Sequence, residues 1–518
     1  MSAASLLIIA CKRFQRSNRI EGLRNLRKIS THSKMCKEQI TVLDDRCRLS
    51  EIDTADFEIS SLSWLHKVAP GFPVNGSKIT IIEEPAVFYS TLLENCKTAK
   101  KRIVLSSLYI GTGKLETKLV ETIEKTLNDR NGNLKVNILL DYMRGSRGKQ
   151  NSRQILQPFL NGKWKNAWNV FLYHTPKLRG FLKSVTPDRF NEMIGLQHMK
   201  LYLFDNTLII SGANLSNDYF TNRQDRYFVI EDCEDLCDFY TDLVEKVGEF
   251  SFRLMPDGNT VPNSTDCDPL ETPSKKFTAS ASGRIRTLFQ KEMEKRSGAN
   301  RLVENVEADT WIFPLVQMSQ LNIWHDSEVT LRLLKMAPSG ATLRLATGYF
   351  NLTTDYRNAL LHESRAVYHL LTAHPTANGF FGAKGIAGGI PAAYTKIEES
   401  FCKLREKMHQ TDRITLWEFM RPGWTYHAKG LWYTLPNQQK PSLTLIGSPN
   451  FGYRSVERDL ETQIAVVTKN EKLQTSLQAE YERLFKRATP VNSTSFRQED
   501  RIPPVWVRAV VLLFRYYF

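Results

Sequence analysis

The sequence contains an internal duplication, and this duplication restricts the possible folds more than any other feature. Two β-prone segments, 102–111 and 343–351, each contain a small residue and a tyrosine near their end. Each segment precedes a helix-like stretch and then further strand-like stretches. The helix-like stretches are 116–127 and 355–365, and the later strand-like stretches are 135–142, 169–174, 366–373 and 413–419. Strands that alternate with helices predict an α/β fold, and the repeat predicts two similar halves.

The chain is long enough for this arrangement. Its 518 residues are 42% hydrophobic and 24% charged, which is typical of a folded protein and excludes wholesale disorder. We expect a first lobe over 57–254, a linker or surface loop over 255–300 where Pro, Gly, Ser and Asp are frequent, and a second lobe over 301–490. The tail over 491–518 is apolar and basic, and its apolar part, 505–518, is too short to cross a bilayer as a helix. It either lies in a membrane interface or packs as a terminal helix.

The charge of the chain is uneven. Residues 1–35 carry eight basic side chains and a single acidic one, Glu21, together with five serines. This composition predicts a mitochondrial transit peptide, and the alternative is a disordered basic tail on a cytosolic protein. The net charge of +15 indicates an anionic partner, which could be nucleic acid, a phospholipid surface or a phosphorylated substrate.

Two short motifs in corresponding positions of the two halves contain the residues best suited to catalysis. The first half reads His198-Met-Lys200 and the second reads His427-Ala-Lys429. Each motif is followed by a strand-like stretch, a Gly/Ser-x-Asn turn and, eleven residues after the Asn, a carboxylate. These further residues are Asn214 and Asp225 in the first half, and Ser448, Asn450 and Glu461 in the second. One His-x-Lys motif is expected by chance, whereas two with the same continuation indicate one duplicated site.

The chemistry of these residues suits the transfer of a phosphate-bearing group. His and Lys two positions apart on a strand point to the same face, so the duplication brings two imidazoles and two ammonium groups together. The ammonium groups and the Asn amides would stabilise a crowded pentacoordinate phosphate. One histidine would attack phosphorus while the other protonates the leaving oxygen. A carboxylate, Asp225 or Glu461, would hold the far nitrogen of a ring and fix its tautomer. We expect no metal, because the lysines supply the positive charge.

This pattern resembles the phospholipase D superfamily, in which His-x-Lys-x4-Asp occurs twice and a Gly-Ser-x-Asn turn follows. The resemblance covers most of 85–485. The first copy is complete and ends at Asp205, which the resemblance places in the catalytic motif. The second copy departs from the pattern, because Thr434 stands where the second Asp is expected and about seven extra residues follow it.

The resemblance implies an α/β fold of two pseudo-repeated phospholipase D-like lobes, with mixed sheets flanked by helices, that share one active site at their interface. It assigns the role of nucleophile to His198 and the role of acid and base to His427, an order that the residues themselves leave open. Longer phrases such as Asn378-Gly-Phe-Phe-Gly-Ala-Lys384-Gly resemble the eukaryotic members of the superfamily that use CDP-diacylglycerol. They imply transfer of the phosphatidyl group to sn-glycerol 3-phosphate through a phosphatidyl-histidine, with release of CMP.

The same resemblance implies a place for the protein. We expect a mitochondrial enzyme that is peripheral to the membrane surface and associated with the inner membrane, and nucleic acid is disfavoured as a partner. No cofactor is required, although stimulation by Ca²⁺ or Mg²⁺ through lipid headgroups is compatible with this chemistry. Two alternatives stay open. One is a phospholipase D-type phosphodiesterase, either a nuclease or a phospholipid hydrolase, with water as the acceptor. The other is an inactive lipid-binding scaffold.

Several other residues are weaker candidates for substrate binding. Four arginines flank the Asn turns and could pair with the phosphate groups of either substrate: Arg223, Arg226, Arg454 and Arg458. Lys384 lies in the glycine-rich stretch 379–389, whose backbone amides could approach a diphosphate. The loop 106–113 partly matches a nucleotide-phosphate loop through Gly111, Thr112 and Gly113, but it lacks the first glycine of that pattern. The alternative for each of them is an ordinary surface or loop position.

Overall fold

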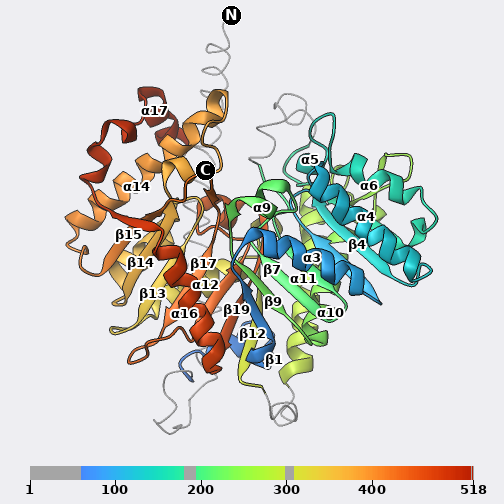
Figure 1. The fold of residues 1–518 in the computed structure, drawn as a ribbon, viewed down its shortest axis with the longest axis horizontal. Helices are drawn as coiled ribbons and strands as arrows, with labels where there is room; N and C mark the ends of the chain where they lie inside the picture. Colours follow the sequence, from blue (N-terminus) through green and yellow to red (C-terminus); the bar gives the residue numbers. More distant parts are fainter. Residues whose placement is uncertain (1–59, 180–193, 298–307, 515, 517–518) are drawn as a thin grey trace, which may run out of the picture. The chain divides into compact units, whose positions relative to one another are not determined.

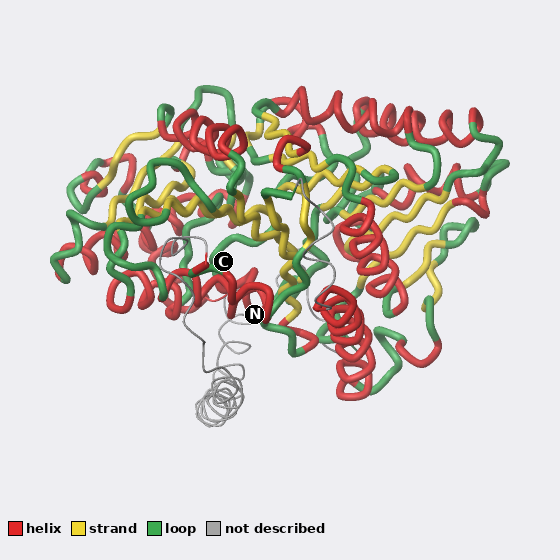
Figure 2. The backbone as a smooth tube through the Cα atoms, turned by 90° about the horizontal axis from the view of Figure 1, so that it is seen from below, coloured by secondary structure: helices red, strands yellow, loops and turns green. Residues whose placement is uncertain are grey.

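A computed structural model of the chain describes residues 60–179, 194–297, 308–514 and 516. The expected transit peptide over 1–35 lies outside these residues. Within the described part, two nine-stranded mixed sheets form the framework. Figure 1 shows strands of the first sheet in blue to green and most strands of the second in yellow to red. In Figure 2, helices lie on both sides of the strands. The α/β class expected from the alternating pattern is confirmed.

The first sheet has the strand order β11-β10-β5-β4-β3-β6-β7-β9-β2. Strands β3, β4 and β5 run parallel to one another. The neighbouring pairs β3–β6, β6–β7, β7–β9 and β9–β2 are antiparallel. The bounds are β2 (Ile79–Ile82), β3 (Arg102–Ser106), β4 (Lys135–Asp141), β5 (Trp168–Tyr173), β6 (Leu201–Phe204), β7 (Thr207–Ser211), β9 (Tyr227–Ile230), β10 (Phe252–Leu254) and β11 (Thr260–Pro262).

The second sheet has the order β1-β12-β19-β18-β17-β13-β14-β15-β20. Its central run β15-β14-β13-β17-β18-β19 reproduces the run β5-β4-β3-β6-β7-β9 of the first sheet, with the same three parallel strands. The internal repeat is therefore a repeat of topology. The bounds are β1 (Phe72–Val74), β12 (Thr310–Met318), β13 (Thr342–Ala346), β14 (Val367–Ala373), β15 (Ile414–Phe419), β17 (Gly430–Thr434), β18 (Leu443–Gly447), β19 (Leu460–Thr468) and β20 (Ala488–Val491).

The helices bury apolar residues that recur every three or four positions and so lie on one face of each helix. In α4 the residues Leu119, Ile123 and Leu127 recur every four positions and pack into the core, which places a single apolar stripe on the sheet. The principal helices are α3 (Pro85–Thr98), α4 (Lys114–Asp129), α6 (Ser152–Leu160), α10 (Glu234–Glu249), α11 (Ser274–Ser297), α12 (His325–Lys335), α14 (Ile390–Lys407), α16 (Glu471–Phe485) and α17 (Val505–Phe514).

One core is shared by both sheets. It combines the inner face of the first sheet, for example Leu203 and Phe228, with the inner face of the second, for example Ile312 and Ile464. Helix α10 contributes Leu243 to the same cluster. Since the two lobes bury their apolar faces against each other, they fold as one body and not as independent domains.

The expected linker over 255–300 is wrong. Strand β10 pairs with β11, and the 24-residue helix α11 follows. Phe277, Ala281, Ile285 and Leu288 of this helix are buried in the shared core. The spacing of these residues is helical. Small or charged residues separate them, however, so the helical pattern of apolar residues was not recognised in the sequence.

The expected boundaries of the lobes also need correction. Strand β1 lies within the stretch assigned to the first lobe, yet it pairs with β12 of the second sheet. Trp64 and Leu65 likewise pack into the core of the second lobe. The tail over 491–518 packs against the second lobe, because the side chains of Val507 and Val511 in α17 are buried in the core of that lobe. Among the described residues, no helix has the length and apolar character needed to span a membrane.

Candidate active site

The two histidines lie where the two lobes meet. His198 lies three residues before β6, and its backbone N–H donates to the Leu460 carbonyl at the start of β19, at 2.8 Å. His427 lies between β16 (Thr425–Tyr426) and β17, and its N–H donates to the Gln224 carbonyl at 2.8 Å. Strand β8 (Arg223–Gln224) pairs in parallel with β16. Each histidine is therefore held by backbone of the opposite lobe.

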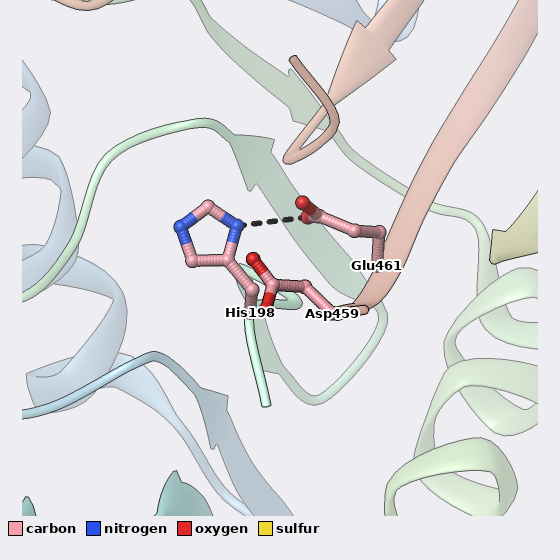
Figure 3. Close-up of side chains that lie close together, drawn as sticks. All are labelled: His198, Asp459 and Glu461. Carbon is pink, nitrogen blue, oxygen red and sulfur yellow. Dashed lines mark hydrogen bonds and ion pairs between the residues drawn. The ribbon is translucent and has the colours of Figure 1, made fainter. Parts of the chain in front are cut away.

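The carboxylates that face the histidines also come from the opposite lobe. Glu461 Oε2 lies 2.9 Å from His198 Nδ1, as Figure 3 shows. Asp225 Oδ2 lies 2.6 Å from His427 Nδ1. Because an ionised carboxylate only accepts hydrogen bonds, both Nδ1 atoms act as donors, and each Nε2 is left with a lone pair for chemistry. Both expected orienting residues thus contact a ring, but the pairing crosses between the two halves.

Both lysines of the motifs are buried beside these pairs. Lys200 Nζ donates to the backbone oxygen of His198 at 2.6 Å. Lys429 Nζ lies 2.7 Å from His427 Nδ1 and 3.6 Å from Asp225 Oδ2. Since Nδ1 already donates to Asp225, the carboxylate is the partner of this ammonium. The two ammonium groups and the two carboxylates therefore form a compact cluster that contains charges of both signs.

Burial sets the protonation of the cluster. It lowers the pKa of Lys200 to about 7, although Glu461 acts in the opposite direction. It raises the pKa of Asp225 to about 6 despite the nearby Lys429. Burial also lowers the pKa of both imidazoles, more strongly for His427, whose cationic form is further disfavoured by Lys429. Both histidines are therefore neutral near pH 7, as a nucleophile and a general base require.

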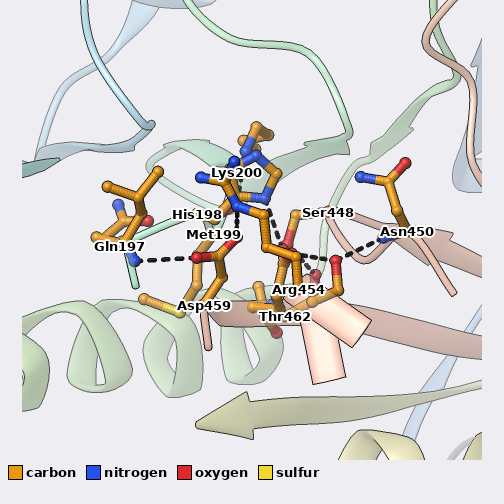
Figure 4. A network of polar contacts seen from close by, with 12 residues as sticks. Gln197, His198, Met199, Lys200, Ser448, Asn450, Arg454, Asp459 and Thr462 are labelled. Carbon is orange, nitrogen blue, oxygen red and sulfur yellow. Dashed lines mark hydrogen bonds and ion pairs between the residues drawn. The ribbon is translucent and has the colours of Figure 1, made fainter. Parts of the chain in front are cut away.

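The Asn turns hold the carboxylates in place. Ser455 Oγ donates to Glu461 Oε1 at 2.7 Å, and the Asn450 N–H donates to the same Ser455 oxygen at 3.0 Å. Ser448 Oγ donates to the Thr462 carbonyl at 3.1 Å. Figure 4 shows Ser448, Asn450 and Thr462 in this network with His198 and Lys200. These contacts fix the position of β19 and hence the position of Glu461.

The sequence reasoning missed a tyrosine at the reactive side of His427. Tyr219 Oη lies 3.4 Å from His427 Nε2 and accepts a hydrogen bond from Asn214 Nδ2 at 3.0 Å. The ring of Tyr349 is also near, with its centroid 5.8 Å from that of His427. Tyr349 lies three residues after β13, as Tyr109 lies three residues after β3, so its recurrence in the repeat was the signal that could have found it. Tyr219 follows Asn214 by five residues, and nothing in the motif marks that position.

The four candidate arginines have different environments. Arg226 is buried and forms a double ion pair with Glu480 of α16, at 2.9 and 2.8 Å. It holds the lobes together and cannot reach a substrate, so its expected role is wrong. Arg223 donates to Thr425 Oγ1 at 2.9 Å and to Asp218 at 3.0 Å, and it contributes to lowering the pKa of His427. It remains a candidate for binding phosphate.

The other two arginines lie on the His198 side. Arg454 Nε donates to Asp459 Oδ2 at 3.0 Å, and its side chain is partly exposed beside the network of Figure 4. Arg458 Nε donates to the Tyr516 carbonyl at 3.4 Å, which makes it a contact of the C-terminal segment. Of this pair, the position of Arg454 is the better one for reaching a phosphate.

Two further candidates have structural roles. Asp205 lies at the far end of β6 from His198, in a left-handed turn with φ of 51°. Its carboxylate accepts the N–H groups of Lys100, Lys101 and Arg102 at 2.7–3.0 Å. It fixes the start of β3, so its placement in the catalytic set is corrected. Thr434 occupies the equivalent end of β17, which explains why the repeat tolerates a different residue there.

The expected nucleotide loop is already occupied by a carboxylate. A side chain on Gly111 or Gly113 would meet the carboxylate of Glu116, which is buried, and the Asn217 N–H donates to it at 2.5 Å. Thr112 lies between these glycines. An anion in this position would repel a phosphate, so the loop does not suit a nucleotide. Lys384 is exposed in the glycine-rich loop that precedes α14 and makes no described contact with the histidines.

One group of residues has the geometry of a metal site. Single ligand atoms of His198, Asp459 and Glu461 lie within 4.8 Å of one another. The oxygens of these carboxylates are already engaged, however. Asp459 accepts from the Leu196 N–H and from Arg454, and Glu461 accepts from His198 and Ser455. A cation here would have to displace these donors, so the residues fit the hydrogen-bonded network better than a resident metal.

Comparisons with known proteins identify relatives of this chain. The chain is 44% identical to the human mitochondrial CDP-diacylglycerol–glycerol-3-phosphate 3-phosphatidyltransferase, over 89% of this chain and 86% of the human one. It is 34% identical to the CDP-diacylglycerol–glycerol-3-phosphate 3-phosphatidyltransferase of Saccharomyces cerevisiae, over 83% of this chain and 85% of the yeast one. No protein-family model matches the sequence.

A solved structure shares the fold. The crystal structure of phosphatidylserine synthase from Haemophilus influenzae superposes with a TM-score of 0.65 at 18% identity, and the match covers 88% of this chain and 96% of that one. Together with the repeated topology of the two sheets, this likeness confirms the two-lobed phospholipase D-like architecture.

Proposed function

Since this chain belongs to the family of CDP-diacylglycerol–glycerol-3-phosphate 3-phosphatidyltransferases, we propose that it transfers the phosphatidyl group of CDP-diacylglycerol to sn-glycerol 3-phosphate. The products are phosphatidylglycerophosphate and CMP. The observation that carries the proposal is the crossed arrangement of two histidines, each paired through Nδ1 with a buried carboxylate of the other lobe. This arrangement provides a nucleophile and a base that face one phosphate site.

In the first step, His198 Nε2 attacks the phosphorus on the diacylglycerol side. A P–N bond forms, the P–O bond to CMP breaks, and CMP leaves with the bonding electrons. Glu461 accepts the Nδ1 proton of His198 in a hydrogen bond and stabilises the positive charge that develops on the ring. The ammonium groups of Lys200 and Lys429 offset the negative charge of the pentacoordinate phosphate.

In the second step, glycerol 3-phosphate enters and its hydroxyl attacks the phosphatidyl-histidine. His427 Nε2 takes the hydroxyl proton, a new P–O bond forms, and the P–N bond to His198 breaks. The neutral state of His427 suits it as a base, and Asp225 stabilises the imidazolium that results. Arg223 is close enough to this ring to help lower its pKa, and its guanidinium supports binding of the acceptor's phosphate.

The decisive experiment compares acceptors. The purified chain is incubated with CDP-diacylglycerol and either glycerol 3-phosphate, serine or water, and both CMP and the lipid product are measured. We expect phosphatidylglycerophosphate to form only with glycerol 3-phosphate. Exclusive hydrolysis would instead support a phosphodiesterase, and no release of CMP would support an inactive scaffold.

The chemical step needs no cofactor, because the two lysines supply the positive charge and the carboxylates already accept hydrogen bonds from neighbouring donors. Chelation by EDTA is therefore expected to leave the transfer of a water-soluble donor intact. Stimulation by Ca²⁺ or Mg²⁺ on vesicles is compatible, since these ions bind lipid headgroups. A loss of the soluble reaction that only one metal restores would contradict this part of the proposal.

The location follows from the substrates and the relatives. Vertebrate relatives carry a mitochondrial designation in their names, and the acid-poor basic N-terminus of this chain is consistent with import. The lipid donor supports a peripheral association with the inner membrane. Fractionation of mitochondria with a carbonate wash tests this placement, because a peripheral protein is released whereas a spanning protein is retained.

A further inference from the structure

Among the described residues, several large apolar side chains are exposed on the loop before α14 and at the start of α17. Phe381 is 60% exposed, Val505 80% and Trp506 47%. Such a group of exposed apolar side chains is unusual on a free surface and marks a site of interaction. We call Phe381, Val505 and Trp506 the apolar rim.

The parts of the rim are joined to one another. The loop folds back so that a side chain on Gly388 would meet the Ala383 carbonyl, and the indole of Trp506 covers Gly389. Helices α14 and α17 also lie side by side. The loop 379–389 and the start of α17, which together carry the rim, are therefore in direct contact.

The rim is connected to the catalytic residues through aromatic rings. Phe380 packs on Tyr349 with ring centroids 5.9 Å apart, and Tyr349 lies 5.8 Å from the ring of His427. A side chain on Gly379 would lie 3.2 Å from Tyr349 Oη and 3.5 Å from Arg223 Nη2. The loop thus begins beside Tyr349 and Arg223 and carries the exposed Phe381 two residues further along.

The protein holds these side chains outward. Arg501 forms two 2.6 Å bonds with the buried carboxylate of Glu418 and anchors the segment before α17. Val507 and Val511 bury the opposite face of that helix. At the loop tip, Gly382 and Gly385 have φ of +74° and +68°, and side chains there would meet no atom within 4 Å. The exposure of the rim is therefore built into the fold.

We propose that the apolar rim inserts into the surface of an anionic lipid bilayer and places the active site over the headgroups of that bilayer. This inference rests on the proposed function for the identity of the donor, whose acyl chains stay in the membrane while its diphosphate reaches the histidines. Charge complementarity supports this occupant. Lys384 and Arg508 are exposed on the same two elements, and basic side chains are attracted to anionic headgroups. Tryptophan is favoured at the boundary between lipid and water.

The test measures flotation of the full chain with phosphatidylcholine vesicles, with and without phosphatidylglycerol. We expect binding that increases with the anionic lipid. The double variant F381S/W506S is expected to weaken vesicle binding by about tenfold or more, because two large apolar side chains no longer enter the bilayer. The variant R508E is expected to weaken it by about fivefold or more on anionic vesicles. The conservative F381L keeps the apolar character and should bind like the parent.

Activity on two forms of the donor separates docking from chemistry. F381S/W506S is expected to lose activity on CDP-diacylglycerol in vesicles and to keep it on a short-chain, water-soluble analogue, which also reports correct folding. The matched control V87S removes an equally exposed side chain of α3, where Val87 is 50% exposed, and should change neither measurement. If the parent chain fails on the soluble analogue, the proposed function is wrong whatever the vesicles show.

Two results would overturn the inference. One is vesicle binding by F381S/W506S that equals that of the parent chain. The other is a rim that mediates contact with a second copy of the chain. In that case, the double variant would lower the molar mass measured by light scattering and leave vesicle binding unchanged.

Discussion

In the first half-site the ammonium of Lys200 lies against the backbone oxygen of His198, whereas in the second the ammonium of Lys429 lies between the ring of His427 and the carboxylate of Asp225. The carboxylates differ too. Burial raises the pKa of Asp225 to about 6, while His198 and Lys200 hold the pKa of Glu461 below its usual value despite burial. One repeated motif has thus produced two electrostatic environments.

This difference suits a division of labour. An ionised Glu461 favours a positive charge on the ring of His198, as a phosphatidyl-histidine requires. The second half-site strongly disfavours a charged His427 before reaction, which keeps that ring available as a base. Duplication therefore supplied matching geometry, and the surrounding side chains assigned the two roles.

The largest expected effect comes from removing either ring. H198A and H427A are each expected to lower kcat by about 10⁴-fold or more, because the nucleophile or the base is lost. The two variants are expected to differ in whether the phosphatidyl-histidine intermediate accumulates. After acid-free denaturation, H427A incubated with labelled CDP-diacylglycerol should retain label on His198, and H198A should retain none. Label on His427 in H198A would reverse the assigned roles.

The next largest effect is expected from the two carboxylates that face a histidine of the opposite lobe, Glu461 and Asp225. E461Q and D225N preserve the shape of each contact but remove its charge, so the preferred tautomer of the ring is no longer fixed. We expect kcat to fall by about 10²–10⁴-fold in both. The comparison is sharpened by pre-steady-state kinetics, in which E461Q should slow the release of CMP and D225N the transfer to glycerol 3-phosphate. Equal slowing of both steps in both variants would contradict the division of labour.

The buried ion pair between Arg226 and Glu480 tests whether the two half-sites depend on one interface. R226M leaves a buried carboxylate without its partner and is expected to lower the free energy of unfolding by about 3–5 kcal/mol. The double variant R226M/E480L removes both charges and should recover most of that loss. Urea denaturation measures both variants. A change in KM for glycerol 3-phosphate without a loss of stability would restore Arg226 as a substrate ligand.

The pH profile should show both environments. Asp225, with a pKa of about 6, must be ionised to hold His427, so kcat/KM is expected to fall about tenfold per unit below that pH. Lys200, with a pKa of about 7, must be charged, so the rate should decline again at higher pH. The variant K200R keeps its charge and should move the alkaline limb upward while leaving the acidic limb unchanged. An unmoved alkaline limb would assign that limb to another group.

The smallest effect on rate is expected for Asp205, the last residue of the first motif. D205N removes charge-assisted hydrogen bonds to the N–H groups of Lys100 and Lys101 and should lower the free energy of unfolding by about 1–2 kcal/mol. Its kcat should change less than twofold, because Asp205 lies at the opposite end of β6 from His198. T434A in the second copy is the matched control and should leave kcat unchanged as well.

Much of the molecule could be predicted because its signals are local. The spacing of the repeats predicted β4 at 135–142 and β15 at 413–419 within one residue of their actual bounds. Helix α11 was missed because its buried Phe277 and Ile285 stand among Lys and Ser residues. The partner of β1 could not be predicted, because pairing with β12 joins residues more than 200 positions apart.

The sequence by itself determined the residue types of the site, the duplication and the fold class, since these follow from periodicity and from the chemistry of His, Lys and carboxylate. Only the tertiary structure decided which carboxylate serves which histidine, that Asp205 and Arg226 are structural, and that Tyr219 faces His427. The reason is physical. Periodicity reports which face of an element is buried, but the contacts across an interface depend on how the two lobes pack, and Glu461 reaches His198 only through that packing.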